Sequence, residues 1–119
     1  MKRYNFKKLQ IWTESMNFIN ETYKLTSTFP DYEKFGLRSQ LNRCSVSIAS
    51  NISEGTSKRT NKHFIKFLED SLGSAFEREI QLIVSLRQEY ISEGLFDSLE
   101  NQVNILQKKI SNFIDRLDP

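Results

Sequence analysis

Positive charge gathers in the middle of the chain, at positions where it could bind phosphate. The cations are Lys58, Arg59, Lys62 and Lys66. Thr60 lies among them and is a good N-cap, so a helix is expected to begin here and to point its free backbone N–H groups at an anion. The pattern predicts contacts with the phosphates of a nucleic acid or another polyanion. The structural alternative is a solvated helix cap whose charge is offset by Glu54.

A second basic cluster lies at the start of the chain, at Lys2, Arg3, Lys7 and Lys8. Charge is divided unevenly between the two halves of the sequence. Residues 1–66 hold twelve Lys and Arg against five Asp and Glu, whereas residues 67–119 hold five against ten. One surface is therefore expected to be strongly basic although the net charge is only +2.

A polar stripe precedes the basic segment. On a helix, the spacing of three and four places on one face Gln40, Arg43, Ser47, Asn51 and Glu54. An apolar stripe lies beside it, formed by Leu37, Leu41, Cys44, Ile48 and Ile52. The helix is expected to end at Gly55 in a left-handed conformation. Glu54 would then occupy the last turn, where the helix dipole disfavours a carboxylate.

The residues opposite this stripe are expected on the next helix, around Gly73 and Ser74. A glycine within a helix costs about 1 kcal/mol relative to alanine, so another backbone is expected to approach closely at Gly73. Folding the two helices back about residue 58 puts Arg43 near Ser74 and Gln40 near Glu77, and permits an ion pair between Arg43 and Glu77. The polar groove predicted in this way comprises Arg43, Ser47, Asn51, Glu54, Ser74 and Glu77. It is either a binding site or a structural device that sets the register of the helices.

The residue inventory disfavours catalysis. The chain has one histidine, His63, and no Glu-x-x-His motif of the kind that di-metal helical bundles use. No histidine accompanies the serines near residue 47 to activate a nucleophile. Cys44, the only cysteine, is expected to be a small buried apolar residue. We therefore expect no enzyme activity, no metal site and no cofactor.

Four periodic apolar runs predict the elements that position these residues. The first helix carries Leu9, Trp12, Met16, Ile19 and Tyr23 and ends before Phe29-Pro30-Asp31. The second spans about 32–54 and the third about 60–90. The last carries Leu99, Val103, Leu106, Ile110, Phe113 and Leu117. Short connections between such helices predict one all-α domain over residues 1–119, an antiparallel up-down-up-down four-helix bundle.

The core of this bundle is expected to contain Leu9, Trp12, Leu41, Ile48, Leu72, Leu82, Val103, Leu106 and Ile110. The third helix is apolar on two sides. Its first stripe is Leu68, Leu72, Ala75, Leu82 and Leu86, and its second is Phe76, Ile80 and Ile83. Either both stripes fill the core, or one packs against another subunit.

The expected compartment is a reducing cytoplasm. The sequence contains no run of about 20 apolar residues that could span a membrane, and its polar start is unlike a signal peptide.

Motifs along nearly the whole chain resemble the bacterial 23S ribosomal RNA intervening-sequence proteins. In order, they are Phe6, Leu9 and Trp12; Phe29-Pro30 with Glu33, Phe35, Gly36 and Leu37; Arg43 with Ser45-Val46-Ser47-Ile48; Asn51-Ile52-Ser53-Glu54-Gly55; Phe64-x-x-Phe67-Leu68; and Gly73-Ser74-x-x-Glu77. The resemblance implies an up-down four-helix bundle that assembles as a ring-like homo-oligomer, a pentamer. A related branch resembles accessory proteins that bind a reverse transcriptase and nucleic acid.

These expectations favour a non-enzymatic, oligomeric scaffold that binds RNA or another nucleic acid. An adaptor for a protein partner, such as an accessory subunit of a nucleic-acid enzyme, is the alternative, with its partner on the polar groove. A third possibility is a small-molecule or nucleotide pocket at the corner between Glu54 and Lys62.

Overall fold

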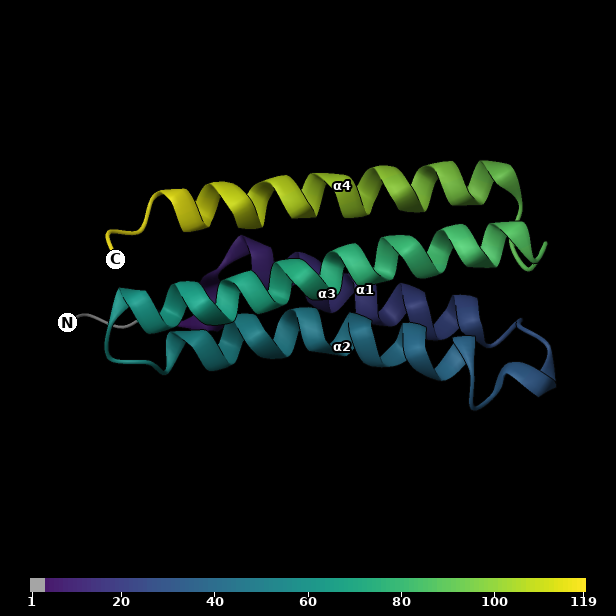
Figure 1. Ribbon diagram of the computed structural model, residues 1–119, viewed down its shortest axis with the longest axis horizontal. Coiled ribbons are helices and arrows are strands. Elements are labelled where there is room, and N and C mark those ends of the chain that lie inside the picture. Colours follow the sequence, from purple (N-terminus) through teal and green to yellow (C-terminus); the bar gives the residue numbers. More distant parts are fainter. Residues whose placement is uncertain (1–3) are drawn as a thin grey trace.

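Four helices lie side by side and form the whole of the regular structure in the computed structural model, which describes residues 4–119. They are α1 (Gln10–Thr26), α2 (Leu37–Thr56), α3 (Asn61–Arg87) and α4 (Glu93–Asp115), with short 3-10 turns η1 (Phe6–Lys8) and η2 (Asp31–Glu33). Consecutive helices run in opposite directions (Figure 1), and the bundle measures 48 × 24 × 20 Å. The predicted all-α four-helix fold is confirmed.

Side-chain caps fix where three of the helices begin. The hydroxyls of Thr60 and Ser92 accept hydrogen bonds from the backbone N–H groups of His63 and Leu95, each at 3.2 Å. The second helix begins later than expected, because residues 31–33 form a 3-10 turn and the Glu33 carboxylate accepts a hydrogen bond from the Leu37 N–H at 3.0 Å.

The prediction for Gly55 is wrong. Helix α2 continues to Thr56, and no glycine among the described residues has a positive φ. A Cβ at Gly55 would lie 2.8 Å from Cδ1 of Phe64 and 3.0 Å from Cβ of Phe67. Gly55 is thus required by the close approach of α3 and not by a left-handed turn.

Replacing Gly55 with alanine is expected to lower the free energy of unfolding by about 1–3 kcal/mol, because the buried Phe64 ring must move to accept the methyl group. Urea denaturation measures the change. Gly94→Ala is the control, since a Cβ at Gly94 meets no atom within 4 Å. Equal stability of the two variants would contradict this explanation.

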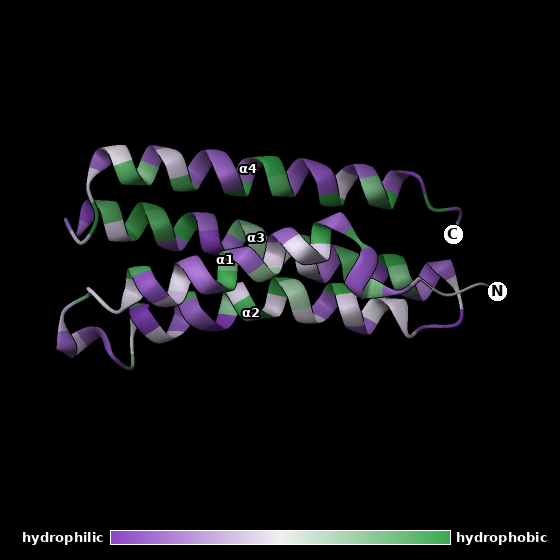
Figure 2. Ribbon diagram, turned by 180° about the vertical axis from the view of Figure 1, so that it is seen from behind, coloured by the Kyte–Doolittle hydropathy of each residue, from purple (hydrophilic) through white to green (hydrophobic). Residues whose placement is uncertain are grey.

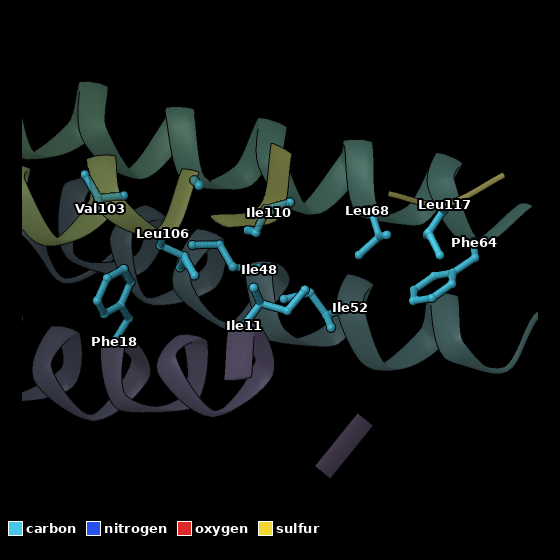
Figure 3. Close-up of a cluster of buried hydrophobic side chains, with 11 residues drawn as sticks. Ile11, Phe18, Ile48, Ile52, Phe64, Leu68, Val103, Leu106, Ile110 and Leu117 are labelled. Atoms are coloured by element: carbon cyan, nitrogen blue, oxygen red, sulfur yellow. The ribbon is translucent and has the colours of Figure 1, made fainter. Parts of the chain in front are cut away.

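The apolar core has two parts. The larger contains Ile11, Phe18, Ile48, Ile52, Phe64, Leu68, Ala75, Val103, Leu106, Ile110 and Leu117 (Figure 3). The smaller contains Phe29, Leu37, Leu41, Leu82, Ile91, Phe96 and Leu99. Most of the predicted core residues are buried, and Leu9, Trp12 and Leu72 are partly buried against the larger part.

Polar residues occupy much of the core-facing side of α1. Thr22 and Ser45 share a hydrogen bond of 2.9 Å, and Nη2 of Arg78 donates to the Thr22 hydroxyl at 3.1 Å. The Arg78 side chain is fully buried, and its guanidinium lies 4.5 Å from the centre of the Phe18 ring. This polar layer joins α1, α2 and α3 inside the bundle and fixes their relative positions.

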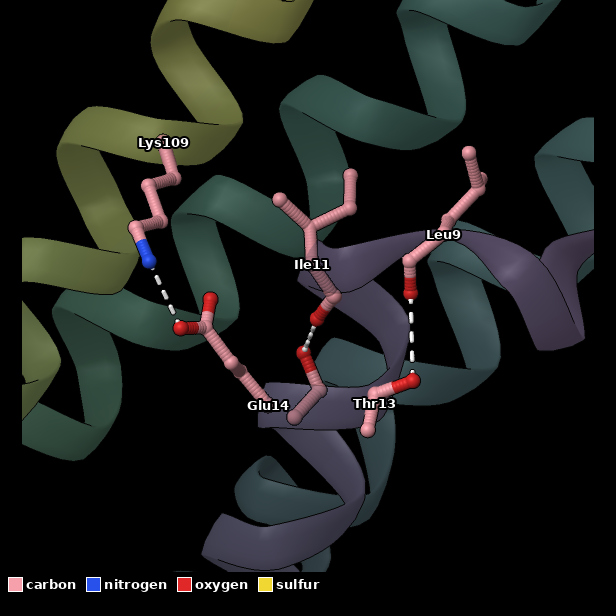
Figure 4. A network of polar contacts seen from close by, with 6 residues as sticks. Leu9, Ile11, Thr13, Glu14 and Lys109 are labelled. Carbon is pink, nitrogen blue, oxygen red and sulfur yellow. Dashed lines mark hydrogen bonds and ion pairs between the residues drawn. The ribbon is translucent and has the colours of Figure 1, made fainter.

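The apolar stripe predicted for α1 is wrong for two of its members. Met16 and Tyr23 are 38% and 52% exposed, whereas Ser15 is completely buried. The Ser15 hydroxyl donates to the carbonyl of Ile11 at 2.6 Å (Figure 4), so its burial leaves no free hydroxyl. Intrahelical hydrogen bonds of this kind allow small hydroxyl residues to take core positions that the apolar pattern does not indicate.

The second stripe of α3 faces away from the core of the single chain. Phe76 and Ile80 are 50% and 61% exposed, although Ile83 is partly buried. Figure 2 shows hydrophobic residues along most of α3. Within one chain, Phe76 and Ile80 therefore do not fill the core.

Candidate nucleic-acid interface and polar groove

The predicted basic segment forms the connection between α2 and α3 and the first turns of α3. Arg59, Lys62 and Lys66 are exposed. Lys58 is partly buried, because its ammonium group lies 4.7 Å from the centre of the Phe67 ring. The apolar ring positions this cation beside the helix start, where free backbone N–H groups also favour an anion.

The second basic cluster lies at the same end of the bundle. Lys7 and Lys8 are exposed on η1, which packs on α2, and the Tyr4 ring lies 5.5 Å from that of Phe64. Figure 1 shows the N-terminal segment and the α2–α3 connection at this common end. Lys2 and Arg3 lie outside the described residues. The described cations of both clusters thus lie toward the same end of the bundle, here called the basic end, which also carries the C-terminal segment with exposed Asp115 and Asp118.

A surface hollow of about 410 Å³ lies between α2 and α3. It is lined by Gln40, Arg43, Cys44, Ser47 and Glu77. The structure therefore brings together three of the predicted groove residues, while Glu54 lies outside the hollow in the last turn of α2.

Hydrogen bonds connect the remaining groove residues to Ser47. The hydroxyls of Ser47 and Ser74 are 2.9 Å apart, and the Asn51 amide donates to the Ser47 carbonyl at 3.0 Å and to its hydroxyl at 3.1 Å. Ser74 thus lies opposite Ser47, about one helical turn from the predicted position opposite Arg43. The connection between α2 and α3, residues 57–60, is centred near residue 58 as predicted, so the end of α2 does not account for this difference.

The expected ion pair between Arg43 and Glu77 is not formed, although both residues line the hollow. Oε1 of Glu77 instead accepts a hydrogen bond from the Gln81 amide at 3.3 Å. Within residues 4–119, the one ion pair joins Lys109 and Glu14 at 2.7 Å (Figure 4). Two exposed side chains of opposite charge are therefore available at the groove.

Within residues 4–119, no other backbone lies close to Gly73. It is exposed, and a Cβ built there meets no atom within 4 Å. The predicted approach of a neighbouring helix is therefore wrong for the isolated chain.

Sequence reasoning missed Gln81 and Arg78. Gln81 accepts a hydrogen bond from the Cys44 thiol at 3.1 Å and donates to Glu77, so it joins two residues that line the hollow. Arg78 lies between Ala75 and Leu82 at the spacing of three and four that marks the core of α3. That spacing was the available signal for its burial.

Burial, helped by the Glu77 carboxylate, raises the pKa of Cys44 from its usual 9.0 to about 12. The raised pKa means that the folded state favours the protonated thiol. The contribution of this thiol to the free energy of unfolding is therefore complete below pH 9.0 and is lost as the pH rises toward 12.

We expect iodoacetamide to alkylate Cys44 at pH 8 only as fast as the protein unfolds, because the thiol is both buried and protonated. The alkylation rate, measured by mass spectrometry, should rise with urea in parallel with the unfolded fraction. Rapid alkylation without urea, at the rate of a free thiol, would contradict the burial of Cys44.

Within residues 4–119, no group of three or more His, Cys, Asp or Glu side chains is arranged to hold a metal ion. None of the helices in this range combines the length and the apolar character needed to cross a bilayer.

Comparisons with known proteins agree with the fold. A crystal structure of a protein of unknown function from the S23 ribosomal protein family of Bacteroides thetaiotaomicron VPI-5482 is 26% identical in sequence, with a TM-score of 0.81. The similarity covers 87% of this chain and 97% of that one. No curated protein matches the chain. The model of the family described as "23S rRNA-intervening sequence protein" matches residues 7–112. The chain therefore belongs to this family, as its motifs predicted.

Proposed function

We propose that the chain is a non-enzymatic scaffold that binds nucleic acid, with RNA as the favoured ligand, through its basic end. The observation that carries the proposal is the gathering of Lys7 and Lys8 with Arg59, Lys62 and Lys66 at one end of the bundle. The family name adds support for RNA. Contacts of this kind recognise phosphates and carry no sequence readout.

Self-association would strengthen the binding of nucleic acid to the basic end. The proposed assembly is a ring-like homo-oligomer, a pentamer, located in the cytoplasm. Exposed Phe76 and Ile80 supply apolar surface for contacts between copies. Several weak phosphate-binding ends on one ring act at high effective concentration, which gives useful affinity from individually weak sites.

Titration of the protein into a labelled RNA hairpin and a DNA duplex at several salt concentrations tests the proposal. Binding should weaken steeply with salt, since every phosphate contact releases counterions. Absence of binding near 0.15 M salt would reject the nucleic-acid scaffold.

A protein-interaction adaptor is the second candidate. The open hollow with exposed Arg43 and Glu77 favours it, because the two charges form no ion pair with each other and could pair with a partner. Changing both residues to alanine should leave RNA affinity unchanged if the basic end binds RNA. The same variant should lose a protein partner under the adaptor hypothesis, as should a variant of Asn51 and Glu54.

The small-molecule alternative has a hollow of about 560 Å³ near the predicted corner, where Lys62, His63 and Lys66 form part of the lining. Glu54 does not line it. Glu69 and Pro119 line it as well, so the hollow is not uniformly basic and we assign no ligand to it.

A further inference from the structure

A further hollow lies between the start of α1 and the end of α4, toward the basic end (Figure 1). Its volume of about 350 Å³ is within the range of small-ligand sites, about 300–1,000 Å³. The lining combines cations, side-chain amides and apolar groups, supplied by Gln10, Ile11, Lys109, Asn112, Phe113 and Arg116.

Both charged residues that line this hollow are cations. Nζ of Lys109 lies 2.7 Å from Oε1 of Glu14 on α1 (Figure 4), and this is the one ion pair within residues 4–119. Arg116 therefore has no carboxylate partner in that range, and it is exposed. Neither Asp115 nor Asp118 lines the hollow. An anionic group is thus favoured here, and a guanidinium binds a phosphate with two parallel hydrogen bonds.

Phe113 gives the hollow an aromatic wall. The centre of its ring lies 5.6 Å from that of Tyr4 and 5.8 Å from that of Phe64. These contacts hold the Phe113 ring in place, although the side chain is only partly buried and still lines the hollow. Nucleic-acid bases stack on aromatic side chains of this kind whatever the base sequence.

Two exposed amides complete the polar lining, at Gln10 and Asn112. A side-chain amide offers both hydrogen-bond donors and an acceptor, so it can pair with an edge of any base. The hollow therefore combines groups that suit the phosphate, the face and the edge of one nucleotide.

We infer that this hollow receives an unpaired nucleotide of an RNA strand, with its phosphate on Arg116 and Lys109 and its base against Phe113. The inference rests on the proposed function and names the form of RNA that makes this extra contact. A base within a duplex cannot enter, because neighbouring bases cover its faces and its partner occupies its pairing edge. Duplex RNA is then bound by phosphate contacts at the basic end alone.

Fluorescence anisotropy with a short unpaired RNA strand and a blunt RNA duplex tests the inference. Arg116→Ala should weaken binding of the strand about tenfold and binding of the duplex much less, since only the strand loses a charged hydrogen bond in the hollow. Arg87→Ala is the control, because it removes an exposed arginine at the other end of the bundle. It should change the affinity for neither RNA.

A second variant tests the aromatic wall. Phe113→Leu keeps an apolar side chain and removes the ring, so it should weaken binding of the strand about fivefold or more and spare the duplex. Circular dichroism checks that the variant folds. Arg116→Ala alters an exposed residue beyond the end of α4, so it provides the test even if Phe113→Leu does not fold.

Three outcomes would overturn the inference: a strand whose affinity Arg116→Ala leaves unchanged, equal losses for strand and duplex, or adenosine monophosphate bound as tightly as the strand. The last would assign the hollow to a free nucleotide. Duplex binding together with any of these results would leave the proposed function intact. Absence of binding to both RNAs would reject the proposed function and this inference together.

Discussion

The variant with Lys58, Arg59, Lys62 and Lys66 all changed to alanine is expected to bind a structured RNA at least about 100-fold more weakly than the unmodified protein at 0.1 M salt. Each lost phosphate contact should also reduce the slope of log K against log salt by about one. The fold should persist, because three of the side chains are exposed and Lys62 lies in the first turn of α3, where the helix dipole disfavours a cation.

A charge-matched control separates a local surface from the total charge. Changing Lys34, Arg38, Arg87 and Lys108 to alanine removes the same number of positive charges outside the basic end. This control should lose much less affinity. Equal losses in the two variants would show that net charge alone attracts RNA.

Arg78 is the site of the second large effect. Arg78→Ala is expected to lower the free energy of unfolding by about 2–5 kcal/mol, because it leaves a cavity in a completely buried position and removes the contacts with Phe18 and Thr22. Arg78→Met should retain most or all of the stability. It fills a similar length with apolar atoms and removes a buried charge whose Nε and Nη1 have no hydrogen-bond partner.

Burial lowers the pKa of the Arg78 guanidinium, while the Glu21 carboxylate acts in the opposite direction. The charged form is thus disfavoured at this position, which is why Met is expected to substitute well. Urea denaturation of the two variants measures the difference. A methionine variant as unstable as the alanine variant would contradict the account, since it would show that the charge itself holds the bundle together.

The helical architecture could be predicted because long apolar runs determine it. The apolar residues from Leu99 in α4 to Leu117, just beyond its end, repeat at intervals of three and four, and nearly all of them are buried. On α1, the same reasoning selected Met16 and Tyr23, because apolar character alone does not distinguish a core from an exposed stripe. The true core side uses Ser15 and Thr22, whose hydroxyls bond to the backbone of the preceding turn.

The site was predictable in part. Positive charge around a helix start is a local property of the sequence, and the structure places Lys58 and its neighbours there. The pairing of Ser74 with Ser47 depends on how α2 and α3 pack against each other along their length, which a count of residues about the connection does not give. The spacing of three and four from Ala75 and Leu82 indicates the burial of Arg78, whereas its hydrogen bond to Thr22 depends on packing across the bundle with α1.

Lysine-acetylation footprinting with and without a bound RNA hairpin can show directly which cations contact RNA. We expect RNA to protect Lys7, Lys8, Lys62 and Lys66 from acetylation, while Lys24 and Lys34 react equally in both states. Protection of Lys24 and Lys34 without protection of the basic end would contradict the account.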